Sequence, residues 1–334
     1  LLDTGPQRPV HARGPRSLEA VRMLRISVTD RCNLRCRYCM PAGGMSFEPR
    51  ETLLAPDRIV RIASAARGLG IDHFKITGGE PTIRRDLPTI VEGLAGLTPT
   101  DLSMTTNGIH LPRLASRLRD AGLARVTVSV DSLRADRYRE ITGGGRRELL
   151  WAGLEAAEAN FNAVKLNVVV VRSVNDDEVV DFARLAIERD WTVRFIEFMP
   201  LGSSAFADRP VHDSLVPADE VAARIADELG ELEPIRWGGD PGVGPARLFR
   251  ISGSRGRIGF IHAMSRPFCE SCNRLRLTSD GMLRSCLFDG GEVDLRPCLD
   301  GPEEGFREAF ERCTALKPEV HGLRGDRAMS SIGG

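Results

Sequence analysis

The stretch LRISVTDRCNLRCRYC, residues 24–39, places three cysteines in a CxxxCxxC spacing directly after a short apolar run. Cys32, Cys36 and Cys39 can hold a four-iron cubane by three corners and leave the fourth iron open to another ligand. Structural zinc prefers four Cys or His ligands in paired motifs. Ferredoxins need a further cysteine before a proline, where this chain has methionine. The spacing therefore predicts an iron-sulfur cluster with one open iron.

A second set of three cysteines lies far along the chain. Cys269 and Cys272 form a CxxC pair, and Cys286 follows after a gap of thirteen residues. One alternative is a structural zinc ion with a borrowed fourth ligand, because CxxC is common in zinc hairpins. We favour the other, a second [4Fe-4S] cluster whose open iron can bind a nitrogen or oxygen of a substrate. The remaining two of the eight cysteines, Cys298 and Cys313, are predicted to be ordinary thiols.

Composition and charge limit the cellular compartments and the classes of partner that suit this chain. It has 334 residues and a formal net charge of +0, so a global basic field for nucleic acid is absent and any anion site must be local. No apolar run reaches the roughly twenty residues of a membrane span, and no leading charged-then-apolar segment suggests secretion. Cysteines in two tight sets suit clusters in a reducing compartment rather than disulfides. We therefore expect a cytoplasmic protein with no nucleic-acid or membrane partner.

Apolar strand patterns alternate with amphipathic helix patterns from residue 24 onward. Six such units predict parallel strands joined by crossover helices. A Rossmann glycine fingerprint is absent, so an α/β fold of the partial TIM barrel type, (β/α)6, is favoured over a doubly wound sheet. The expected strands are residues 24–29, 73–77, 102–105, 125–130, 164–171 and 193–198, and the expected helices are residues 56–67, 86–97, 111–121, 148–160 and 177–189.

Composition divides the chain into three regions. Residues 1–20 are rich in Arg, Pro and Gly and are typical of a flexible arm. Residues 21–230 carry the barrel. Residues 231–334 form a C-terminal extension that carries the second cluster, with a Gly-rich loop at 237–245. Because active sites of such barrels gather at the carboxyl ends of the strands, we expect the motifs after each strand to meet at one face.

The first cysteine motif is similar to a superfamily signature. CNLRCRYC, with an aromatic residue before the third cysteine, resembles the radical S-adenosylmethionine (SAM) superfamily, and the TGGEP turn at 77–81 resembles its second signature. The resemblance implies a [4Fe-4S] cluster on Cys32, Cys36 and Cys39, with SAM chelating the fourth iron. It also implies reductive cleavage of SAM to methionine and a 5'-deoxyadenosyl radical, with Gly79 against the methionyl part of SAM.

Motifs further along the chain narrow the resemblance from the superfamily to one of its families. FIEFMP at 195–200, the block FCESCNRLRLTSDGMLRSCLF at 268–288 and the terminal Gly333 and Gly334 resemble the GTP 3',8-cyclase family. Alternating arginines inside that block point to one face of an extended strand. Their guanidinium forks match phosphate oxygens, which favours an anionic substrate over a merely solvated strand face.

The family resemblance implies a role for individual residues. Tyr38, Ser129 and Met199 match positions near SAM, and the double glycine is implied to reach into the active site. Lys75 stands where the family commonly has arginine, and His73 where it often has lysine, so triphosphate contacts are less certain at those two positions. The residues at GTP-contacting positions are Arg25, Lys75, Thr105, Lys165, Arg194, Arg274 and Arg276.

The implied reaction converts GTP to 3',8-cyclo-7,8-dihydro-GTP, a lyase reaction that is the first step of molybdenum cofactor biosynthesis. It uses two [4Fe-4S] clusters, SAM and an external one-electron donor, and its product passes to cyclic pyranopterin monophosphate synthase. A homodimer is a further expectation. Two alternatives stay open: another radical SAM enzyme with an auxiliary cluster, such as a peptide modifier, and a two-cluster electron-transfer protein that is not an enzyme.

Overall fold

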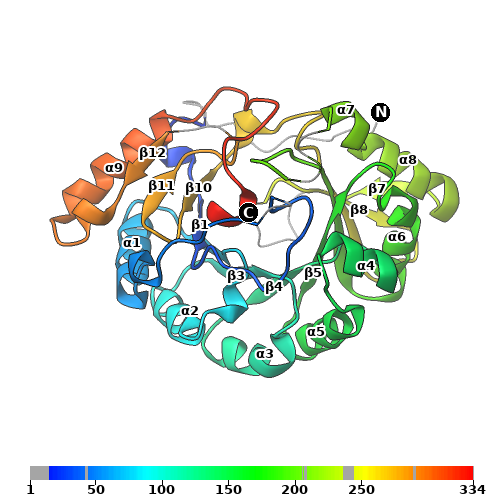
Figure 1. The fold of residues 1–334 in the computed structure, drawn as a ribbon, viewed down its shortest axis with the longest axis horizontal. Helices are drawn as coiled ribbons and strands as arrows, with labels where there is room; N and C mark the ends of the chain where they lie inside the picture. Colours follow the sequence, from blue (N-terminus) through cyan, green and yellow to red (C-terminus); the bar gives the residue numbers. More distant parts are fainter. Residues whose placement is uncertain are drawn as a thin grey trace.

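The computed structural model describes residues 15–41, 44–204, 206, 209–235, 244–288 and 291–333. Six neighbouring parallel strands form an open barrel with helices on its outer side (Figure 1), which confirms the expected partial barrel. The strands are β1 (Met23–Ser27), β2 (His73–Thr77), β3 (Asp101–Thr106), β4 (Arg125–Ser129), β5 (Val164–Val170) and β6 (Trp191–Glu197). The helices that follow them are α1 (Pro56–Gly68), α2 (Leu87–Gly96), α3 (Leu111–Asp120), α4 (Ala135–Ile141), α5 (Arg147–Asn160), α6 (Val179–Glu188), α7 (Val211–Ser214) and α8 (Ala218–Leu229).

The barrel strands bury two chemically different faces. Leu24 and Ile26 of β1 and Phe74 of β2 are fully buried in the apolar core that the strands share with the outer helices. Because side chains alternate along a strand, the residues between them point to the barrel interior. Register places Arg25 beside Lys75 on that inner face. The interior is therefore lined by polar and cationic groups rather than filled with apolar side chains.

The C-terminal region extends the same sheet at both edges. β10 pairs in parallel with β1, and β9 pairs in parallel with β6. β11 and β12 continue beyond β10, while β8 and β7 continue beyond β9. Because β10 pairs with β1, Arg276 lies beside Arg25. The bounds are β7 (Leu232–Pro234), β8 (Arg247–Ile251), β9 (Arg257–Ile261), β10 (Arg274–Leu277), β11 (Met282–Arg284) and β12 (Glu292–Asp294).

Some elements were not predicted from the sequence. Among the α-helices of the described residues they are α4, α7, α8 and a helix after β12, α9 (Glu303–Ala315), none of which falls on an expected helix. Part of the expected arm is ordered: η1 (Leu18–Ala20) lies against α9, and Arg16 Nε donates to the Lys317 carbonyl at 2.7 Å. The first fourteen residues and most of the Gly-rich loop lie outside the described residues.

The C-terminal segment runs from α9 across the barrel mouth and ends near its centre, as the red trace in Figure 1 shows. Cys313 is buried in α9 with its thiol against the Leu283 carbonyl, and Cys298 contacts the Gly305 carbonyl, as expected of ordinary thiols. Within the described ranges, every helix is too short or too polar to cross a membrane.

Candidate active site

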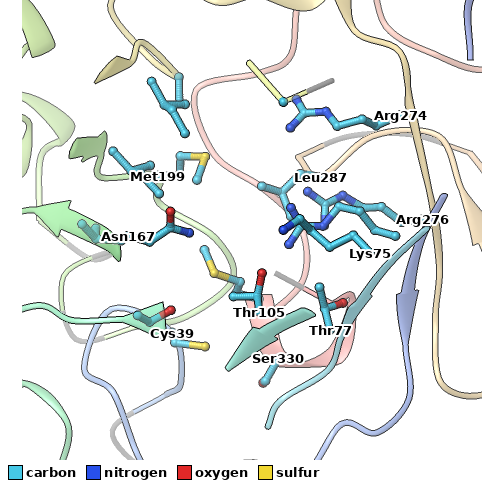
Figure 2. Close-up of a pocket in the computed structure, with 18 of the residues that line it drawn as sticks. Cys39, Lys75, Thr77, Thr105, Asn167, Met199, Arg274, Arg276, Leu287 and Ser330 are labelled. Atoms are coloured by element: carbon cyan, nitrogen blue, oxygen red, sulfur yellow. The ribbon is translucent and has the colours of Figure 1, made fainter. Parts of the chain in front are cut away.

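Both cysteine sets line one pocket at the carboxyl ends of the barrel strands. Figure 2 shows Arg274, Arg276 and Lys75 gathered on one side of it, with Met199 and Asn167 on the opposite side. The strand-end motifs thus meet at one face, as the alternating pattern predicts. The predicted site residues that line this pocket are Arg25, Cys32, Cys36, Tyr38, Cys39, Lys75, Gly79, Thr105, Ser129, Arg194, Met199, Cys269, Cys272, Arg274, Arg276 and Cys286.

Other predicted residues lie elsewhere. Lys165 is buried on β5, two residues before the lining residue Asn167, and is not part of the pocket lining. His73 begins β2, away from the carboxyl end, and its Nδ1 lies 2.7 Å from Oδ1 of Asp72. That position keeps His73 out of the pocket, whereas Lys75 lines it. Gly334 lies outside the described residues.

The loop that carries the first cysteines is held by the end of α4. The backbone N–H of Arg35 donates to the Thr142 carbonyl, and that of Arg37 to the Ile141 carbonyl, both at 2.9 Å. Gly143 has a φ of +65°, and a Cβ there would lie 2.7 Å from the Arg35 carbonyl oxygen. Only glycine allows so close an approach in that conformation. The helix α4, which was not predicted from the sequence, therefore fixes the loop that carries the first cysteine triad.

The two glycines of TGGEP also pack against the cysteine loop. The Gly79 N–H donates to the Thr29 carbonyl at 2.7 Å, and the Glu80 N–H donates to the Arg31 carbonyl at 2.8 Å. A Cβ on Gly78 would lie 2.6 Å from the Thr29 oxygen, and one on Gly79 would lie 2.4 Å from the Arg31 oxygen. Backbone packing thus requires glycine here, in addition to any contact with SAM.

Three buried carboxylates at strand ends hold the loops around the pocket. Glu80 accepts from the Asn107 N–H and the Thr106 hydroxyl, both at 2.7 Å, although burial raises its pKa. Asp131 accepts from the Tyr38 hydroxyl at 2.8 Å, and burial raises the pKa of Asp131 to about 6. The Tyr38 hydroxyl is thus committed to Asp131.

The third carboxylate, Glu197 at the end of β6, accepts from the N–H groups of Ala218 at 2.8 Å and Met264 at 2.7 Å. It thereby joins the start of α8 to the loop after β9. The role of Glu197 was not predicted from the sequence, because its partners lie 21 and 67 residues away along the chain.

Burial favours the protonated form of the thiols of the first set. Burial raises the pKa of Cys32 to about 11 and that of Cys39 to about 12. Cluster assembly must displace these protons, because the thiolate is the ligand. In the second set, burial again acts to raise the pKa of Cys272, but the positive charges of Lys317 and Arg274 lower it to about 6.

The donor chemistry of both sets fits iron-sulfur clusters, which take cysteine thiolates as ligands. Among the described residues, no three His, Cys, Asp or Glu side chains converge as the ligands of one metal ion would. A cubane instead takes its three cysteines on three different iron atoms, so its ligands are spread around it. Each cysteine triad contributes three thiols to the pocket wall, and three cysteine thiolates would hold one cubane.

Buried cations form the most unusual electrostatic feature of the pocket. Burial, followed by repulsion from Arg276, Arg274 and Arg194, holds the pKa of Arg25 well below its usual range, and its Nε has no hydrogen-bond partner among the described residues. Burial and the neighbouring Arg194 lower the pKa of Lys75, and burial and Arg274 lower that of Arg276 to about 9. Buried like charges destabilise a fold unless an anion joins them. Binding of a polyanionic ligand would therefore stabilise this group of cations.

The end of the chain reaches this cationic group. Arg276 Nη1 donates to the Gly333 carbonyl at 2.6 Å. Gly333 has a φ of +69°, and a Cβ there would lie 2.7 Å from Thr77 Oγ1 and 2.9 Å from Ser27 Cβ. A side chain would not fit, so the penultimate position requires glycine.

Comparisons with known proteins agree with this site. Residues 26–186 match the Radical SAM superfamily model, and residues 191–323 match Molybdenum Cofactor Synthesis C. The GTP 3',8-cyclase of Moorella thermoacetica is 46% identical over 325 residues, which cover 94% of this chain and 98% of that protein. The GTP 3',8-cyclase of Geobacter sulfurreducens is 44% identical over 323 residues, which cover 94% and 97%.

Solved structures show the same fold at low identity. Streptococcus suis SuiB bound to S-adenosylmethionine matches with a TM-score of 0.59 and 13% identity, over 90% of this chain and 65% of that one. The open barrel, with its cysteine loop after β1, defines a radical SAM protein. Within that superfamily, the chain belongs to the GTP 3',8-cyclase family, as its near full-length similarity to the curated relatives shows.

Proposed function

We propose that this chain converts GTP to 3',8-cyclo-7,8-dihydro-GTP, the first step of molybdenum cofactor biosynthesis. The observation that carries the proposal is the single pocket that two cysteine triads and a buried cationic group line together. This one cavity would combine a radical-generating cluster, an auxiliary cluster and an anion site. Such a combination suits a nucleoside triphosphate as the substrate. Family membership supports the same reaction.

The first triad, Cys32, Cys36 and Cys39, would hold the cluster that binds SAM, with Gly79, Ser129 and other residues of that wall around it. When bound, this cluster and SAM supply a 5'-deoxyadenosyl radical that removes one hydrogen atom from the substrate ribose. Enclosure of that step by the strands of the open barrel would limit competing reactions with water and stray side chains.

The cationic group would bind the triphosphate. Arg274 and Arg276 project from β10, and Arg25 and Lys75 project from the neighbouring strands, so the group surrounds one side of the pocket. Guanidinium forks bind phosphate oxygens in pairs of hydrogen bonds. The second triad, Cys269, Cys272 and Cys286, lines the same pocket and would hold the cluster that takes the guanine edge. Fixing both ends of GTP would place its ribose in reach of the radical.

An anaerobic assay tests the function and both alternatives. The reconstituted protein is incubated with SAM, dithionite and GTP, and the nucleotide products are identified by mass spectrometry. Formation of the cyclised nucleotide, dependent on SAM, is expected. Cleavage of SAM without any change in GTP would favour a radical SAM enzyme with another substrate. Absence of SAM cleavage, with both clusters intact, would favour the electron-transfer protein.

Iron content tests the assignment of two clusters. Anaerobic reconstitution of the wild-type chain should give about eight irons and eight sulfides, because each triad holds one cubane. Replacing Cys269, Cys272 and Cys286 together with alanine should halve both numbers and leave SAM cleavage in place. Bound zinc at the second triad, with full activity, would overturn this assignment.

Deletion of the two terminal glycines tests the tail. The cyclised product should fall on the order of 10²-fold, because a small misplacement of reacting groups is costly and the Gly333 carbonyl helps to orient Arg276. Iron content and melting temperature should be unchanged. Gly333→Ala is a point control that should act in the same direction, since its Cβ has no room. Full product formation by the truncated chain would remove the tail from the mechanism.

The remaining partners follow from the chemistry. Reduction of the first cluster needs an external one-electron donor, and the product would pass to cyclic pyranopterin monophosphate synthase. A homodimer and a cytoplasmic location stay predictions from the sequence.

A further inference from the structure

The C-terminal strap, defined as residues 317–333, reaches a sulfur of both cysteine triads. Lys317 Nζ lies 3.5 Å from Cys272 Sγ and donates to the Arg274 carbonyl at 2.6 Å. The backbone N–H of His321 donates to Cys269. Beyond them, the backbone N–H of Ser330 donates to Cys39, across the pocket in the first triad. One continuous segment therefore supplies donors to sulfurs at both ends of the site.

The strap is held in place along its length. Arg284, whose side chain is 1% exposed, donates to Asp326 of the strap, to Glu292 at 2.7 Å and to the Cys286 carbonyl at 3.1 Å. The Gly325 N–H donates to the carbonyl of Pro200 at 2.9 Å, which ties the strap to the loop after β6. Arg284 thus joins the strap to the loop of the second triad. These anchors fix where the sulfur donors lie.

The backbone N–H of Ser330 has the sulfur of Cys39 as its partner. In the short helix η7 (Met329–Ser331), the Ser331 N–H donates to the carbonyl of Ala328, and the Ile332 N–H donates to that of Met329. The Ser330 N–H points to Cys39 instead. Hydrogen bonds to cysteine sulfurs stabilise the added negative charge of a reduced cluster and so raise its reduction potential.

We propose that the C-terminal strap is a positioning element that raises the reduction potential of both clusters, through Ser330 at Cys39 and Lys317 at Cys272. The proposal rests on the proposed function only in requiring two clusters. Because the reduction potentials of the clusters are measured without GTP, the outcome of the test does not depend on whether GTP is the substrate.

The first test replaces one donor. Ser330→Pro removes the N–H at a first-turn position where proline is tolerated, and Ser330→Ala keeps the N–H and is its matched control. The midpoint potential of the first cluster is measured by a redox titration followed by electron paramagnetic resonance, in a chain whose second triad is alanine. Ser330→Pro should shift the potential to a more negative value, and Ser330→Ala should not. A first cluster that assembles in Ser330→Ala but not in Ser330→Pro would support the same contact. Equal potentials in all three proteins would overturn it.

The second test acts on the other cluster. Lys317→Met removes the charge and donors but keeps an unbranched side chain, and Lys317→Arg restores the charge. In a chain whose first triad is alanine, Lys317→Met should make the potential of the second cluster more negative, and Lys317→Arg should recover part of the shift. Loss of packing alone would lower the melting temperature without this charge-dependent recovery. An unchanged potential in Lys317→Met would contradict the role of the strap at the second triad.

Discussion

Cys36→Ser reduces 5'-deoxyadenosine formation to background, the largest effect that we expect from any single substitution. Cys36 is the middle cysteine of the first triad in the sequence, and it packs against the apolar cluster that contains Tyr38, Ile141 and Phe198. A serine hydroxyl is nearly the same size, so packing is kept, but it is a far poorer iron ligand than a thiolate. The measurement is anaerobic SAM cleavage with dithionite, followed by chromatography.

Cys298→Ser is the matched control for that experiment. Cys298 lies outside the pocket and contacts the Gly305 carbonyl at 3.4 Å, a contact that a hydroxyl can also make. We expect wild-type cleavage from this control. SAM cleavage at the wild-type rate in Cys36→Ser would contradict the ligand assignment.

Arg276→Met weakens GTP binding by about 10- to 100-fold, since hydrogen bonds to charged groups contribute about 1.5–3 kcal/mol each. Burial and Arg274 lower the pKa of Arg276 to about 9, so the folded protein disfavours this cation at pH 7. Removing the charge should therefore leave the stability of the GTP-free protein unchanged or increase it, while GTP loses a partner. Equilibrium GTP binding and thermal unfolding are measured on the same sample.

Two further variants separate charge from geometry in that experiment. Arg276→Lys keeps the charge but loses the fork, so its GTP affinity should fall between those of the wild type and Arg276→Met. Arg184→Met removes an exposed arginine of α6 that pairs with Asp181 and should change nothing. GTP affinity equal to wild type in Arg276→Met would place the triphosphate elsewhere.

The barrel was predictable because its strands and helices carry strong local patterns. Leu24 and Ile26 on β1, and Leu111, Ala115 and Leu118 on α3, repeat at the periods of a strand and a helix and are all buried. Four of the strands that the C-terminal region adds to the sheet, β7, β10, β11 and β12, have three or four residues each. Such short segments carry little periodicity. The alternating arginines predicted an extended strand at β10, but its partner β1 lies some 250 positions earlier. Pairing over that distance leaves no local signal.

The site residues also fall into two groups, those that a local sequence pattern predicts and those whose roles depend on distant partners. Cysteine spacing and the Arg274 to Arg276 alternation are local, and the structure brings those residues to one pocket. Asp131 and Arg284 are buried polar residues whose roles depend on partners 93 and 42 residues away, Tyr38 and Asp326. A sequence pattern does not contain such contacts, because tertiary folding creates them.

We propose that a radical derived from SAM acts on the ribose of GTP in this pocket. The most direct measurement uses GTP that carries deuterium at C3', incubated with the reconstituted protein, SAM and dithionite without oxygen. Mass spectrometry of the 5'-deoxyadenosine should show one deuterium acquired from the nucleotide, together with the cyclised product. 5'-Deoxyadenosine that forms without deuterium, while GTP is recovered unchanged, would contradict the claim.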